Sequence, residues 1–148
     1  MALWQPARLP RGYRELWCQE LTALSQLAWL RARLRETLTG SATVVHPERE
    51  HWSERLVLIA DELTSNALRH GAPPVAAALG RLADRWLVTV SDSSASAPPE
   101  PAQDRDPVLG GFGLYLVADL SAQHGWVLER GAKKVWAVVR ADDEVTHG

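Results

Sequence analysis

The chain has 148 residues, of which 46% are hydrophobic and 23% charged, and a formal net charge of −2. This length predicts one domain over residues 1–148, with no room for a separate sensor or dimerisation unit beside a catalytic domain. The composition excludes a disordered chain, and the lack of a basic stripe makes nucleic-acid binding the weakest functional interpretation. No apolar run reaches the length of roughly 18 residues that a membrane span needs, because charged residues interrupt each one, so we expect no membrane partner.

The single cysteine, Cys18, cannot form an internal disulfide. The N-terminus lacks the basic and apolar regions of a signal peptide, and we therefore expect a cytoplasmic protein. The tryptophans are scattered singly along the chain, which leaves both core packing and partner contact open for them.

The N-terminal part of the chain predicts one helix after an irregular start. Residues 1–12 carry prolines without periodicity, so we expect a loose lead-in there. The segment Leu16–Thr22 is compatible with either a short strand or the start of a helix. Apolar residues then repeat at helical spacing up to Gly40, which predicts a helix over about Ala23–Thr39. The arginines of this helix point in several directions, which indicates a solvated face rather than a basic patch.

A second helix is predicted from Pro47 at its first position to about His70, where Gly71 stops it. Glu62 and Asn66, one turn apart, lie on the flank of its apolar stripe, where both side chains are costly to desolvate without partners. The spacing therefore suggests a lined site, although an isolated pair of this kind is also typical of a solvated helix end. The stripe itself, which we expect in the core, comprises Leu56, Ile59, Ala60, Leu63 and Ala67.

Two strands and a long loop follow the second helix. Val75–Arg81 and Arg85–Ser91 predict a hairpin, and Asp92 lies at its exit. Residues 93–107 are rich in Ser, Ala and Pro, which is typical of a lid or of a disordered segment.

A further helix is predicted from Gly110 through about Gln123, followed by a hairpin of residues 126–129 and 134–140. The acidic tail, residues 141–148, is expected to fray. Helices grouped with hairpins, in place of strict alternation, predict the α+β class, as a two-layer sandwich with a mostly antiparallel sheet and helices on one face.

Three polar features at element ends together resemble a nucleotide site: Glu62 and Asn66 on the second helix, Asp92 at the exit of a strand, and the glycines at Gly110–Gly113. Glycines at the helix start Gly110–Gly113 let backbone amides approach an anion, although a plain loop-to-helix turn also needs glycine, and the run matches neither the P-loop nor the dinucleotide pattern. An ionised Asp92 offers only acceptors and suits the exocyclic amine of adenine, but a turn-forming Asp is equally compatible. Asn66 can give its side-chain oxygen to Mg²⁺, and Glu62 can accept a proton from an attacking hydroxyl.

The run Glu62–Gly71 resembles the N-box of the Bergerat-fold ATPases, the superfamily of histidine kinases, type II topoisomerases and related chaperones. Asp92 stands where the first glycine box of that family begins, Gly110–Leu114 resembles the second, and Lys134–Trp136 resembles its closing strand. The resemblance covers residues 41–140 in order and spacing. In its small size the chain is most similar to the bacterial anti-sigma factor serine/threonine kinases, in particular the short actinobacterial group of ATP-binding regulators.

The resemblance implies the Bergerat ATP-binding fold, with ATP and Mg²⁺ as cofactors and an ATP lid at residues 93–109. The site residues that it implies are Glu62 as general base, Asn66 as ligand of Mg²⁺ and part of the ATP site, Asp92 as adenine anchor, and Gly111, Gly113 and Leu114 along the phosphate loop.

By this resemblance the leading interpretation is a Mg-ATP-binding regulator that phosphorylates Ser or Thr on an antagonist (anti-anti-sigma) protein and holds a sigma factor, with a homodimer left open. The chain shows no separate phosphoacceptor helix, and His70 is expected to be packed and hydrogen-bonded near the buried side of its helix. A complete sensor histidine kinase is therefore disfavoured.

The turn after Asp92 departs from the family pattern. Glycines usually follow the adenine-binding aspartate in this family, whereas Ser93, Ser94 and Ala95 follow it here. This departure favours a second interpretation, a non-catalytic protein-interaction module whose nucleotide site is degenerate or ligand-gated.

Overall fold

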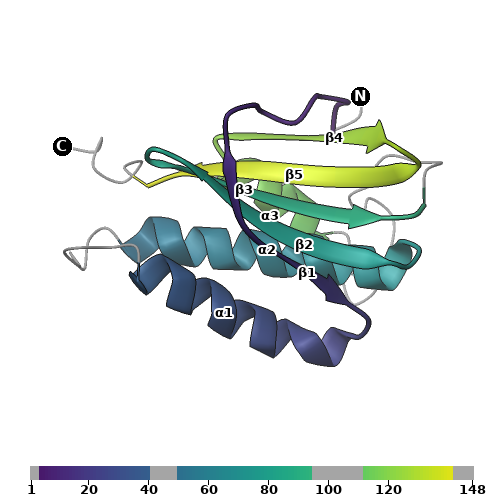
Figure 1. Ribbon diagram of the computed structural model, residues 1–148, viewed down its shortest axis with the longest axis horizontal. Coiled ribbons are helices and arrows are strands. Elements are labelled where there is room, and N and C mark those ends of the chain that lie inside the picture. Colours follow the sequence, from purple (N-terminus) through teal and green to yellow (C-terminus); the bar gives the residue numbers. More distant parts are fainter. Residues whose placement is uncertain (1–3, 41–49, 95–111, 142–148) are drawn as a thin grey trace.

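A computed structural model describes residues 4–40, 50–94 and 112–141, and these fold into two layers (Figure 1). One layer is a five-stranded antiparallel sheet in the order β1-β2-β3-β5-β4, and the helices cover one of its faces. The predicted α+β sandwich is confirmed. The elements are β1 (Arg14–Leu21), α1 (Leu27–Gly40), α2 (Glu50–His70), β2 (Val75–Leu82), β3 (Arg85–Asp92), α3 (Phe112–Leu120), β4 (Gln123–Glu129) and β5 (Ala132–Arg140).

The main core lies between the helices and the inner face of the sheet. The apolar stripe predicted on the second helix is buried along its whole length in α2, and it meets Leu79, Val88 and Ala137 of the three central strands. Alternate residues of the strands face the helices because successive side chains of a strand point to opposite faces. The stripe therefore fixes which face of α2 meets the sheet, and with it the direction of the polar flank.

The helix expected over Ala23–Thr39 is present as α1, after one 3-10 turn at Leu24–Gln26. The segment left open between strand and helix forms β1, and the predicted first hairpin is confirmed as β2 and β3. The expected helix start at Pro47, Gly110, Gly111 and most of the expected lid and tail lie outside the described residues.

The end of the third helix differs from the prediction. A helix was expected through Gln123, but α3 ends at Leu120 and Gln123 is the first residue of β4. The Ser121 amide still donates to the carbonyl of Val117 at 3.0 Å, whereas the next amide, that of Ala122, donates to Val138 of β5 at 2.7 Å. Pairing with a neighbouring strand thus replaces the helical hydrogen bonds at this point, which a local helical pattern does not reveal.

The outer face of the sheet is covered by the N-terminal segment. Leu87, Trp136 and Val138 form a second apolar cluster there, packed against Ala7, Leu9 and Tyr13 of that segment.

Within the expected loose lead-in, residues 4–7 are held along β4. The Ala7 amide donates to the carbonyl of Trp126 at 2.9 Å, and the Trp126 amide donates to the carbonyl of Gln5 at 3.3 Å. The indole Nε1 of Trp136 donates to the carbonyl of Ala7 at 3.0 Å. The edge of β4 and the buried indole group of Trp136 thus supply the hydrogen bonds that order this part of the N-terminus.

No helix among the described residues is long and apolar enough to cross a membrane.

Substituting Gly125 with Ala is expected to loosen the N-terminal segment. A Cβ at Gly125 would lie 2.7 Å from the Cβ of Ala7 and 2.9 Å from Cζ2 of Trp136, so the segment must move away from β4. We expect the free energy of unfolding to fall by about 1–3 kcal/mol, as for other overpacked sites, with faster hydrogen exchange at the Ala7 amide. Leu128→Ala, at an exposed position of the same strand, serves as the control with a change below about 0.5 kcal/mol. Unchanged stability and exchange in Gly125→Ala would contradict this account of the segment.

Candidate functional site

The side chain of Glu62 projects from α2 directly against the start of α3. A Cβ built on Gly113 would lie 2.6 Å from Cδ of Glu62 and 3.1 Å from its Cγ, and would overlap its Oε2. No side chain larger than hydrogen fits between them without displacing the carboxylate. The structure therefore brings together two features that the sequence predicted separately, the polar flank of α2 and the glycine-rich start of α3.

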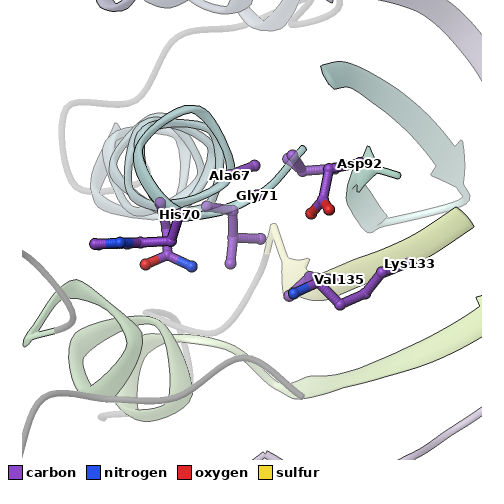
Figure 2. Close-up of a pocket in the computed structure, with 9 residues that line it drawn as sticks. Ala67, His70, Gly71, Asp92, Lys133 and Val135 are labelled. Carbon is purple, nitrogen blue, oxygen red and sulfur yellow. The ribbon is translucent and has the colours of Figure 1, made fainter. Parts of the chain in front are cut away.

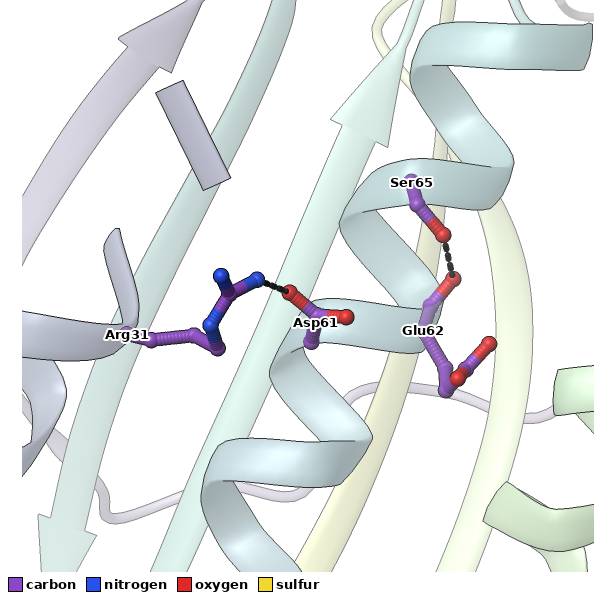
Figure 3. Close-up of polar contacts among 4 residues, drawn as sticks. All are labelled: Arg31, Asp61, Glu62 and Ser65. Carbon is purple, nitrogen blue, oxygen red and sulfur yellow. Dashed lines mark hydrogen bonds and ion pairs between the residues drawn. The ribbon is translucent and has the colours of Figure 1, made fainter. Parts of the chain in front are cut away.

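The side chains of Glu62 and its neighbour Asp61 leave α2 in different directions, with Asp61 directed toward Arg31 and Glu62 away from it (Figure 3). The Asp61 carboxylate accepts a charged hydrogen bond of 2.6 Å from Arg31 of α1. The carboxylate of Glu62 receives no hydrogen bond from the described residues, and the Ser65 hydroxyl beside it donates to the backbone carbonyl of Glu62 at 3.3 Å. Asp61 thus ties α1 to α2, whereas the Glu62 carboxylate remains available.

The pKa of Glu62 is raised above its ordinary value. Burial is the larger cause, because it penalises the charged form, and the negative charge of Asp61 adds to it, while Arg69 opposes both. A carboxylate with a raised pKa and no fixed hydrogen-bond donor is suited to accept a proton from a bound hydroxyl.

Asp92 is buried at the end of β3, with 3% of its surface exposed. Its Oδ1 accepts hydrogen bonds from the Ser94 amide at 2.7 Å and from the Ala72 amide at 3.4 Å. A Cβ on Gly71 would lie 2.6 Å from Cγ and 2.8 Å from Oδ2 of Asp92. Gly71, predicted only as the stop of the helix, thus also allows the carboxylate to sit against the end of α2.

A pocket opens between the end of α2 and the strands β3 and β5 (Figure 2). Asn66 and Asp92 both line it, so the structure joins two of the predicted site residues there. Glu62 lies one turn before Asn66 and outside the lining. The lining residues are Leu63, Asn66, Ala67, His70, Gly71, Val90, Asp92, Lys133 and Val135.

Of the predicted ATP-site residues that the structure describes, Gly113 and Leu114 do not line this pocket. Leu114 is 1% exposed and belongs to the hydrophobic core, so its side chain packs under α3. Gly111 lies outside the described residues, and of the phosphate loop only Gly113 is placed, against Glu62.

Two pocket residues were misjudged or missed. His70 was expected to be packed, but it is exposed and lines the pocket, because the last turn of α2 extends beyond the core. Lys133 was not considered, although its alternation with Val135 and Ala137 along β5 places all three on the inner face.

The Histidine kinase-like ATPase domain family model matches residues 22–139 of this chain, which is most of its length. The chain belongs to this family. Membership indicates that the domain binds ATP. A comparison with curated proteins finds no significant match.

The residues of the pocket fit an adenine nucleotide of the kind that this ATPase family binds. No hydrogen bond from the described residues reaches Oδ2 of Asp92, which leaves an acceptor for the exocyclic amine of adenine. Asn66 offers an amide oxygen in the same pocket, and such an oxygen together with phosphate oxygens is a common environment for Mg²⁺.

Replacing Glu62 with Gln is expected to stabilise the protein at high pH and not at low pH. Because the folded-state pKa of Glu62 is raised, ionising the carboxyl destabilises the fold above that pKa, and the effect disappears below the unfolded value, near pH 4. We expect Glu62→Gln to raise the melting temperature by about 1–3 °C at pH 8 and to match the wild type at pH 4. Asp61→Asn, which loses the ion pair with Arg31, is the contrasting control and should melt lower at pH 8. A lower melting temperature of Glu62→Gln at pH 8 would contradict the assigned shift.

Proposed function

We propose that this protein is a Mg-ATP-binding regulator of the anti-sigma factor type, which phosphorylates Ser or Thr on an antagonist protein and holds a sigma factor. The observation that carries the proposal is the approach of Glu62 to Gly113, beside a pocket that holds Asn66 and Asp92. An ATPase domain needs a group that accepts a proton and a group that anchors the adenine ring, and these four residues provide both kinds of group.

Each residue has a role that follows from its chemistry. ATP supplies the γ-phosphoryl group when it is bound. Asp92 accepts a hydrogen bond from the adenine amine, and Asn66 gives its amide oxygen to Mg²⁺. Glu62 takes the proton of the attacking hydroxyl. Its raised pKa makes it a stronger base than an ordinary glutamate. The absence of a side chain at Gly113 leaves space for the Glu62 carboxylate at the start of α3.

A non-catalytic interaction module with a ligand-gated site is the second candidate. It is favoured by the turn after Asp92, in which the amides of Ser94 and Ala72 already occupy Oδ1 of the carboxylate. Such a turn is stable without nucleotide. Calorimetry with Mg-ATP separates the candidates, because no heat and no thermal shift at millimolar nucleotide would exclude the kinase.

Glu62→Gln is expected to abolish phosphotransfer and to leave ATP binding unchanged, because glutamine fills the same space but cannot accept a proton. The measurement is transfer of label from Mg-ATP to partner proteins recovered by pull-down, together with calorimetry of the same variant. Glu54→Gln, at an exposed position of α2 where the side chain faces Arg35, is a matched control that should retain full transfer. Transfer at the wild-type rate by Glu62→Gln would remove this residue as the base.

Asn66→Ala is expected to weaken nucleotide binding about tenfold in the presence of Mg²⁺ and to have little effect in the presence of EDTA, because it removes an oxygen ligand of the metal. Titration calorimetry with ATP under both conditions measures the difference. Ser65→Ala, next to it on α2, is the control. An equal loss of affinity with and without Mg²⁺ would show that Asn66 contacts the nucleotide or supports the pocket without holding the metal.

A further inference from the structure

Lys133 is a buried lysine at the floor of the pocket. It lies near the start of β5 and is paired in register with Asp92 of β3. Its exposed fraction is 9%, and it lines the pocket together with Asp92. The next residue, Lys134, points to the other face, where its ammonium group lies 3.1 Å from a Glu129 carboxylate oxygen.

The ammonium group of Lys133 has no partner among the described residues. Neither a hydrogen bond nor an ion pair joins it to residues 4–40, 50–94 or 112–141. An ammonium group that borders a pocket can donate hydrogen bonds to a ligand bound there. Figure 2 shows the side chain of Lys133 running along the pocket, with the carboxylate of Asp92 directed toward the same space. A ligand that enters this space is in a position to supply the acceptor.

We propose that Lys133 determines base specificity by donating a hydrogen bond to ring nitrogen N1 of adenine. N1 lies beside the exocyclic amine, from which Asp92 accepts a hydrogen bond. The inference rests on the proposed binding of ATP. Adenine presents a donor, its exocyclic amine, next to an acceptor, N1. An ionised carboxylate only accepts and an ammonium group only donates, so Asp92 and Lys133 match this edge. Lys133 and Asp92 are paired in register across β5 and β3, so both side chains start from neighbouring positions on the inner face of the sheet.

The register of Lys133 with Asp92 favours a contact with the base. Lys133 shares the pocket with His70, at the end of α2. Glu62, which contacts the start of α3, lies about 12 Å before His70 along the helix. The same pocket also holds Asn66, the proposed ligand of Mg²⁺, so the test compares AMP with ATP to distinguish a contact with the base from one with the phosphates.

The test compares ATP with 1-deaza-ATP, in which a C–H group replaces N1, on the full chain and on two variants. Lys133→Met removes the donor and keeps a long side chain, and Lys134→Met makes the same change in charge on the opposite face. Titration calorimetry should show that the wild type and Lys134→Met bind ATP about tenfold more tightly than 1-deaza-ATP. Lys133→Met should bind both ligands equally, with affinity for ATP reduced about tenfold, and the same reduction should appear with AMP.

Three results would overturn the inference while leaving the proposed function standing. Equal binding of ATP and 1-deaza-ATP by the wild type removes the contact with N1, and this measurement does not depend on how well the variant folds. A loss in Lys133→Met that grows from AMP to ATP assigns the lysine to phosphate. A preference for ATP that persists in Lys133→Met assigns N1 to another group. If the wild type binds neither AMP nor ATP, the proposed function fails, and the inference falls with it.

Discussion

The close packing of α2 against its neighbours at two glycines is the constraint on which the site depends. At Gly71 the chain passes within contact of the Asp92 carboxylate, and at Gly113 it passes within contact of the Glu62 carboxylate. A methyl group at either position would push an acidic side chain out of place. Both glycines are therefore part of the arrangement of charge in the site, in addition to any contribution to the backbone conformation.

The neighbouring carboxylates of α2 show how the fold separates two acidic roles. Asp61 is held by Arg31 of α1, and this pair joins the two helices across the surface. Glu62 forms no ion pair with the described residues, and burial and the charge of Asp61 raise its pKa, which Arg69 opposes. The Asp61 carboxylate that joins α1 to α2 thus also makes the neighbouring Glu62 carboxyl group less acidic.

The sequence predicted the features that depend on local patterns. The buried stripe of α2 and the place of Asp92 at the end of β3 follow from periodicity and strand length, and both are confirmed. The predicted end of the third helix was wrong because Ala122 pairs with Val138 of β5, a long-range contact that no local pattern encodes. The prediction that His70 is packed was wrong for a similar reason, since the extent of α2 beyond the core depends on how the layers pack. Lys133 became part of the site only when the register of β3 and β5 placed it opposite Asp92.

The N-terminal segment has a consequence for how the sheet can meet other chains. An unpaired strand edge is a template for pairing with another molecule, and residues 5–7 occupy that edge along β4. The same segment covers the tryptophan-bearing outer face. The chain therefore shields one border and one face of its own sheet, and within the described strands the exposed border is that of β1, on the far side of the sheet from β4. Among the described strands, the border of β1 is thus the one left open to pairing with another strand.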